Sequence, residues 1–244
     1  MDTTALNIAV VICAAGASSR FKHKDSPVCK KEYQKLSNGN TVLGTAVSTF
    51  ASVPSVRVIV ISIPENDEDA ARSALPANLL TSEKPKILFV TGGSTRRHSV
   101  FNALRLLTDF NPDYALIHDG ARPWVSSSLI ENIITAVKKH NAVIPLLPLT
   151  DTPKECESPW EAQTDNDVSP VFIKNHLKRK NIGIAQTPQA FKFPEILEAH
   201  KKAANVETEE FTDDAEIWGR FCGKVAVIQG DPENRKITFP EDLI

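Results

Sequence analysis

The sequence has few cysteines, no excess of charge of one sign and no long apolar run, and each absence excludes a class of protein. Its 4 cysteines lie far apart and form no Cys-x-x-Cys pair, so neither a zinc site nor a disulfide framework is expected. No apolar stretch reaches the roughly 20 residues that span a bilayer. The formal net charge is −2, whereas a protein that coats nucleic acid is basic overall.

Two phosphate-binding signatures are also missing. The chain contains neither the G-x-G-x-x-G fingerprint nor the G-x-x-x-x-G-K-[ST] P-loop. The absence of the first motif disfavours a dinucleotide-dependent dehydrogenase.

The first apolar run is short, lacks a basic leader and ends in a glycine turn, which is typical of a first strand rather than a signal peptide. Together with the scattered cysteines, this predicts a cytoplasmic protein.

What the sequence does contain is an alternation of β-branched apolar runs with helical patterns. The run VRVIVISI is apolar on both faces, as in a parallel sheet that helices cover on both sides. We therefore expect an α/β fold, with a doubly wound, mostly parallel, Rossmann-like sheet, in a single domain over residues 1–244. Strands are expected at 8–13, 56–63, 86–90, 114–118, 142–146 and 224–228, and helices at 41–51, 67–79, 95–108, 127–140, 193–204 and 211–219.

Residues 148–180 interrupt this alternation. The segment is polar, contains prolines and shows little period, and it is too long for a simple connection within a compact domain. We expect it to form a protruding arm of short strands that serves in binding or dimerisation.

The first apolar run is followed by AAGASSR at residues 14–20. Ligands of doubly wound sheets bind beyond the carboxyl ends of the strands, and a glycine there lets backbone amides approach an anion closely. Arg20 and Lys31 could converge on such a phosphate, although the turn alone fits an ordinary strand-to-loop connection. The neighbouring Lys22, Lys24, Lys30 and Lys35 are expected to be solvated.

A second glycine turn, TGGSTRRHSV at residues 91–100, precedes a helical pattern. Gly92 and Gly93 could let the backbone approach a planar base, and Ser94 is the expected N-cap. A capped helix does not account for the cluster Arg96-Arg97-His98, because cations in a first turn oppose the helix dipole.

HDGARP at residues 118–123 follows another buried run. Asp119 could hold Mg²⁺ or a ribose hydroxyl, and Arg122 could bind phosphate, although the pair could equally pin the loop. Further donors suited to a sugar phosphate lie near the two ends of the 148–180 segment, at Thr152, Lys154, Arg179 and Thr187. Lys236 lies in a later turn and by itself would be assigned to solvent.

The motifs AAG…R, KEYQKL, GGSTRRHSV, HDGARP, DTPK, AQTPQAF, TDDA and NRKITFPEDL occur in this order. In this order the chain resembles the 2-C-methyl-D-erythritol 4-phosphate cytidylyltransferase family, over about residues 8–243. The resemblance implies that CTP reacts with methylerythritol phosphate and releases pyrophosphate. It further implies Mg²⁺ on the triphosphate, with Asp119 as a possible ligand, and a homodimer in which the arm reaches into the partner's site.

The resemblance also assigns roles to individual residues. Arg20 and Lys31 would be catalytic. Ala14, Ala15, Gly16, Gly92, Gly93, Ser99 and Asp119 would bind the nucleotide, and Arg122, Thr152, Arg179, Thr187 and Lys236 would bind the sugar phosphate.

The chain departs from the usual pattern of the family at two positions near the first loop. Ser18 replaces a glycine, and Lys30 replaces a proline. Two other functions remain open at this point: transfer of the cytidylyl group to ribitol 5-phosphate, and a non-catalytic nucleotide-binding module of the same fold.

Overall fold

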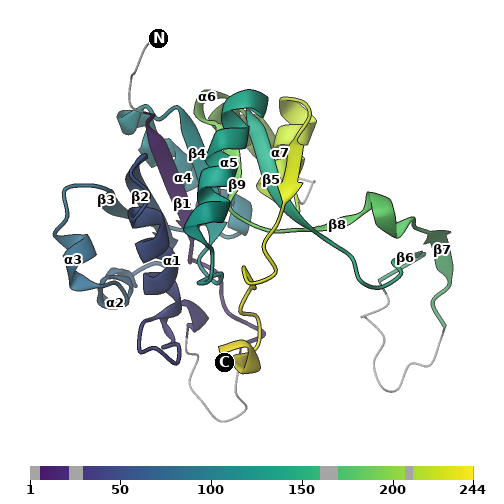
Figure 1. Ribbon diagram of the computed structural model, residues 1–244, viewed down its shortest axis with the longest axis horizontal. Coiled ribbons are helices and arrows are strands. Elements are labelled where there is room, and N and C mark those ends of the chain that lie inside the picture. The colour runs from purple at the N-terminus through teal and green to yellow at the C-terminus, as the bar shows by residue number, and fades with distance from the viewer. Residues whose placement is uncertain (1–5, 22–29, 160–169, 207–210, 244) are drawn as a thin grey trace.

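The computed structural model describes residues 6–21, 30–159, 170–206 and 211–243, and its centre is a mixed sheet of eight strands (Figure 1). The strand order is β10-β5-β9-β4-β1-β2-β3, with β8 paired to β5 beside this path. The strands are β1 (Ile8–Cys13), β2 (Val56–Ile63), β3 (Lys86–Thr91), β4 (Tyr114–Asp119), β5 (Ala142–Pro148), β8 (Gly183–Ala185), β9 (Gln189–Lys192) and β10 (Ala226–Gln229).

Strand direction follows from the helical crossovers. β1 pairs in parallel with β2 and β4, β2 with β3, and β5 with β10. β9 lies between β4 and β5, antiparallel to both, and joins the two parallel parts of the sheet. As a result, β1, β3 and β4 end at the same edge, and the prediction of a doubly wound, mostly parallel α/β fold is confirmed.

Helices cover both faces of the sheet, as the apolar strand pattern predicts. In β1, Ile8, Val10 and Ile12 pack into one core cluster, while Ala9 and Val11 pack into the other. Successive side chains of a strand point to opposite faces, so a strand buried on both sides must be apolar throughout. The first cluster includes α1 (Val42–Ala51), α2 (Glu68–Ser73) and α5 (Ser127–His140), and the second includes α4 (Arg96–Leu106), α6 (Phe193–Ala204) and α7 (Asp214–Phe221).

The single helix expected at 67–79 is wrong. The chain instead forms α2 and a short α3 (Ala77–Leu80), with Pro76 at the N-cap of α3. A proline cannot donate a backbone hydrogen bond, and it disfavours a helical conformation in the residue before it. Short 3-10 helices complete the described structure: η1 (Lys31–Tyr33), η2 (Leu107–Phe110), η4 (Arg179–Asn181) and η5 (Pro240–Leu243).

The expected arm is present. β6 (Lys154–Cys156) and β7 (Ile173–His176) form a separate antiparallel pair that extends away from the central sheet (Figure 1). The arm and its base expose large apolar side chains, with Phe172 64% and Ile184 51% accessible. Within the described ranges, no helix combines the length and the apolarity that a membrane span requires.

Candidate active site

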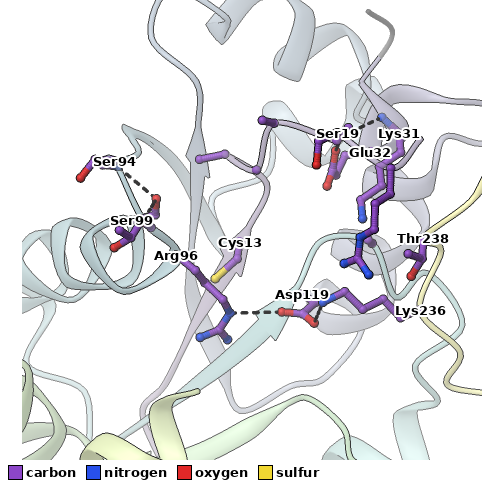
Figure 2. A pocket seen from close by; sticks show the side chains of 18 residues that line it. Cys13, Ser19, Lys31, Glu32, Ser94, Arg96, Ser99, Asp119, Lys236 and Thr238 are labelled. Carbon is purple, nitrogen blue, oxygen red and sulfur yellow. Dashed lines mark hydrogen bonds and ion pairs between the residues drawn. The ribbon is translucent and has the colours of Figure 1, made fainter. Parts of the chain in front are cut away.

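A cleft of about 550 Å³ opens where β1, β3 and β4 end (Figure 2). One wall is the loop that follows β1, and another is the turn between β3 and α4. Asp119, the last residue of β4, lies at the base, and the C-terminal segment closes the cleft with Lys236 and Thr238. The cleft therefore lies where doubly wound sheets bind their ligands.

The two loop walls touch each other, and small residues make this possible. A Cβ atom at Gly92 would lie 2.3 Å from the Cβ of Ala15 and 2.9 Å from the Oγ of Ser99. At Gly93 it would lie 2.3 Å from the Cβ of His98. Gly16 differs, because a Cβ there would meet no atom within 4 Å. The first two glycines are required by packing, while Gly16 leaves its side of the cleft open to a ligand.

The start of α4 is fixed by two hydroxyls. Thr95, not the expected Ser94, is the N-cap, and its side chain accepts a hydrogen bond from the amide of His98 at 3.2 Å. The Oγ of Ser99 accepts from the amide of Gly93 at 3.0 Å and donates to the carbonyl of Thr95 at 3.0 Å. Both hydrogen bonds of the Ser99 hydroxyl are to backbone groups, so Ser99 fixes the glycine turn.

Asp119 is a buried carboxylate with cations around it. Its Oδ2 lies 2.8 Å from the Nζ of Lys236 and 3.6 Å from the Nε of Arg122, and its Oδ1 lies 3.5 Å from the Nε of Arg96. Figure 2 shows Arg96 and Lys236 reaching the carboxylate from opposite sides. Burial alone would raise the pKa of Asp119, but these cations outweigh it and hold the pKa far below its usual range. Asp119 is therefore ionised at any physiological pH.

Arg96 links the cleft to a buried network on the other side of α4. Its Nη1 lies 2.8 Å from the Oδ2 of Asp214, a fully buried residue in the first turn of α7. The Oδ1 of Asp214 lies 3.1 Å from the Nε2 of His200 on α6. Burial favours the neutral acid, yet Arg96 and His200 lower the pKa of Asp214, so the pair remains ionic.

The C-terminal segment is fastened across the site by backbone contacts. Arg122 donates from Nη1 to the carbonyl of Asn234 at 2.8 Å, and Asn234 donates from Nδ2 to the carbonyl of Thr187 at 2.7 Å. The amide of Ile237 donates to Ala121 at 2.8 Å, and Ile237 itself is fully buried. These contacts place the neighbouring Lys236 over the end of β4.

Thr187 and His118 form a buried support beneath Asp119. The hydroxyl of Thr187 accepts from the amide of Asp119 at 3.1 Å and lies 3.0 Å from the Nδ1 of His118. The Nε2 of His118 lies 3.0 Å from the carbonyl of Arg122, which can only accept, so this nitrogen carries the proton. Burial lowers the pKa of His118 to about 4, so its ring is neutral and Nδ1 accepts from Thr187.

The structure brings most, but not all, of the expected site residues together. Arg122 and Thr187 lie behind the cleft wall, where their polar groups brace other residues. Arg179 lies at the arm and donates to the carbonyl of Thr150, and Thr152 lies beside β6, so neither lines the cleft of its own chain. The expected residues that line the cleft are Ala15, Gly16, Arg20, Lys31, Gly93, Ser99, Asp119 and Lys236, with Ala14 and Gly92 directly adjoining them.

Sequence reasoning missed Arg96, Asp214 and the role of Lys30. The uncompensated cations in the first turn of α4 were a signal for Arg96, and its partner lies in TDDA, a family motif to whose acidic residues no role was assigned. Lys30 was expected to be solvated, but its ammonium contacts the carbonyls of Ala14 and Gly16. Lys35 is exposed as expected, while Lys22 and Lys24 lie outside the described residues.

A family model described as 2-C-methyl-D-erythritol 4-phosphate cytidylyltransferase, or IspD, matches residues 8–244. The chain belongs to this family. Two solved structures cover almost the same length. One, described as a 4-diphosphocytidyl-2C-methyl-D-erythritol synthase from Anaerococcus prevotii, is 28% identical with a TM-score of 0.77 and covers 98% of this chain and 93% of that chain. The other, described as the IspD of Francisella tularensis, is 29% identical with a TM-score of 0.73, covering 97% and 96%.

Curated relatives include longer proteins, each described as a bifunctional enzyme IspD/IspF. The protein of a Bradyrhizobium species is 38% identical over 244 residues, which cover 99% of this chain and 56% of the relative. The protein of Brucella anthropi is 36% identical over 242 residues, which cover 99% and 54%. The chain thus spans about half the length of these curated relatives.

We expect Gly92→Ala to weaken the contact between the two IspD loop walls. The added methyl overlaps Ala15, so the unfolding free energy should fall by about 1–3 kcal/mol, as for other overpacked sites. Gly16→Ala is the matched control, because its methyl meets open space and should change stability by less than about 0.5 kcal/mol. Denaturant unfolding of both variants measures this, and equal losses would contradict it.

We expect the buried His118 to make stability depend on pH. The folded-state pKa is about 4, below the ordinary 6.5, so the unfolded chain binds the additional proton. The contribution of neutral His118 to the unfolding free energy is fully present above pH 6.5, and it declines as the pH falls toward 4, by up to about 3 kcal/mol. His118→Gln keeps a donor to Arg122 but cannot titrate. Denaturant unfolding at neutral and acid pH should show a smaller acid loss in this variant, and parallel pH curves would contradict the assignment.

Proposed function

We propose that the chain is a cytidylyltransferase that joins CTP to 2-C-methyl-D-erythritol 4-phosphate and releases pyrophosphate. The observation that carries this proposal is the cleft itself, where two glycine loops meet beside Arg20, Lys31 and Lys236 around one ionised carboxylate. Family membership and the names of the solved relatives support the choice of substrates.

In this reaction a phosphate oxygen of methylerythritol phosphate attacks the α-phosphorus of CTP. One phosphorus–oxygen bond forms, the bond between the α-phosphorus and the bridging oxygen to the β-phosphate breaks, and pyrophosphate leaves with the electron pair. The attacking phosphate is already ionised near neutral pH, so no general base is needed. Burial raises the pKa of Cys13 to about 12, so its thiol in the cleft stays protonated and is no nucleophile.

The residues of the chain act by position and charge. Arg20 and Lys31 lie along the same wall, where they would neutralise charge on the non-bridging oxygens of the α-phosphate. Lys31 also donates to the carbonyl of Ile237 at 2.9 Å, which fixes its direction. Burial lowers the pKa of Lys31 and the Glu32 carboxylate opposes this shift, and a triphosphate nearby would favour the protonated form of Lys31.

Magnesium fits this site as a partner of the nucleotide. Mg²⁺ is usually held by one or two carboxylates together with substrate phosphates, and Asp119 supplies an ionised carboxylate on the cleft surface. The Oδ1 atom of Asp119 has only a long contact, 3.5 Å to Arg96, among the described residues. When bound, the ion would neutralise charge on the triphosphate and on the leaving pyrophosphate.

The proposal includes a homodimer in the cytoplasm. Arg179 and Thr152 lie on the arm, away from the cleft of their own chain, so they would reach the sugar phosphate only in a second copy. The exposed apolar residues of the arm and its base, Phe172, Ile173, Leu177 and Ile184, would provide a surface for that copy. A reducing compartment agrees with Cys13, Cys156 and Cys222, which are free thiols.

The first test incubates the protein with CTP, Mg²⁺ and either methylerythritol 4-phosphate or ribitol 5-phosphate, and follows pyrophosphate release. We expect release with methylerythritol phosphate, and a loss of at least about 100-fold in kcat/KM in both Arg20→Ala and Lys31→Ala. Lys35→Ala, which removes an exposed lysine, should leave the rate unchanged.

The two other functions give different results in the same assay. Release with ribitol phosphate alone would keep the mechanism and replace the substrate. Binding of CTP without release of pyrophosphate with either acceptor would overturn the proposed enzymatic activity and favour a binding module.

A trans-complementation experiment tests the dimer. If each site combines Lys31 of one chain with Arg179 of the other, Lys31→Ala and Arg179→Ala should each be inactive alone. Mixing them as exchanging dimers should restore up to about a quarter of the wild-type activity, because half of the dimers are mixed and each of those has one intact site. No recovery after subunit exchange, shown by light scattering of tagged chains, would contradict the shared site.

A further inference from the structure

Lys30 lies against the first loop rather than in solvent. Its Nζ donates to the carbonyl of Gly16 at 3.0 Å and also to the carbonyl of Ala14. The ammonium lies 5.9 Å from the centre of the Tyr33 ring and beside Glu32. Burial lowers the pKa of Lys30, and the neighbouring carboxylates of Glu32 and Asp67 oppose that shift. The side chain is thus held by several partners at once.

Contact with these two carbonyls fixes the direction of the peptides that carry them, 14–15 and 16–17. Both oxygens point at a single ammonium, which has three donors and so binds them together. The same loop presents Ala15, Gly16 and Ala17 to the cleft. Amide groups of such a loop are suited to bind an anion once their carbonyls are turned away. Lys30 therefore binds carbonyl oxygens of the loop, whereas a phosphate would bind its amide groups.

The far end of the loop is held from the same short segment. Ser18 has a φ of 50°, in the left-handed region that non-glycine residues rarely occupy. Its hydroxyl donates to the Oε2 of Glu32 at 3.3 Å and accepts from the amide of Lys31 at 3.4 Å. Glu32 is 3% exposed, so this carboxylate is a fixed partner. Residues 30–32 thus hold the loop at residues 14, 16 and 18.

We propose that Lys30 is a positioning residue that holds the backbone of the Ala14–Ser18 loop in the conformation that binds the triphosphate of CTP. It acts through the carbonyls of Ala14 and Gly16 and makes no contact with the reacting phosphorus. This inference rests on the proposed function. It separates the roles of two adjacent lysines: Lys31 faces the nucleotide, and Lys30 orders the loop that receives it.

The test compares Lys30→Met, Lys30→Arg and, as a matched control, Lys35→Met. Methionine keeps most of the aliphatic chain over Tyr33 but cannot donate. We expect Lys30→Met to raise both the KM and the Kd for CTP about 10-fold, with kcat within about three-fold and an unchanged KM for the sugar phosphate. Lys30→Arg should restore much of the affinity, because arginine can donate to both carbonyls. Lys35→Met should match the wild type.

The outcomes distinguish this inference from its alternatives. A fall in kcat as large as in Lys31→Ala would place Lys30 on the reacting phosphate and overturn the positioning role. A lower Tm with unchanged KM and Kd would overturn it in favour of a purely structural role. Hydrogen exchange of the 14–19 peptide in the free protein should be faster in Lys30→Met. Unchanged hydrogen exchange of this peptide in Lys30→Met would overturn the role of Lys30 whether or not CTP binds. Failure of the wild type to bind CTP would instead overturn the proposed function.

Discussion

The structure of the site depends on a single buried charge, the carboxylate of Asp119. An isolated carboxylate at the end of a central strand would be costly to bury, and Asp119 is stable there because cations from three directions surround it. Arg96 comes from α4, Arg122 from the turn after β4, and Lys236 from the C-terminal segment. Elements that are far apart in the sequence are therefore joined by one charge, and removing it would leave several cations unpaired.

Small residues impose the second constraint, since they let the loops at this edge of the sheet come together. Gly92 packs on Ala15, and Gly120 lies under Cys13, where a Cβ would be 2.9 Å from its carbonyl oxygen. At these positions the backbone of one segment lies directly against its neighbour. A loop packed in this way cannot move without displacing that neighbour, and a site that is already ordered positions a ligand without reorganisation.

The sequence predicted the fold well because its signals were local. Apolar runs such as Ile8–Cys13 and Val56–Ile63 are buried on both faces, and no partner is needed to recognise them. The loops of the site were predictable for the same reason, through glycine and the rule that ligands bind at strand ends. The pairing of Arg96 with Asp214 was not, because it joins residues 118 positions apart. The position of Lys30 was not predicted because its partners are backbone carbonyls, which every residue carries, so residue types in the sequence do not indicate them.

The cations around Asp119 differ in how firmly they are held, and this difference determines which of them a ligand could draw away. Arg96 is also bound to Asp214, and Arg122 is also bound to the carbonyl of Asn234, so neither can leave without breaking a second buried contact. Lys236 is 39% exposed, and within the described residues its charged partner is Asp119 alone. A phosphate that entered the cleft would therefore compete with one carboxylate for Lys236, whereas it would have to disrupt a network to draw away either arginine. The site thus combines a fixed electrostatic frame with one cation that a ligand phosphate could draw away, and Oδ2 of Asp119 would then keep Arg122 as its ion-pair partner at 3.6 Å.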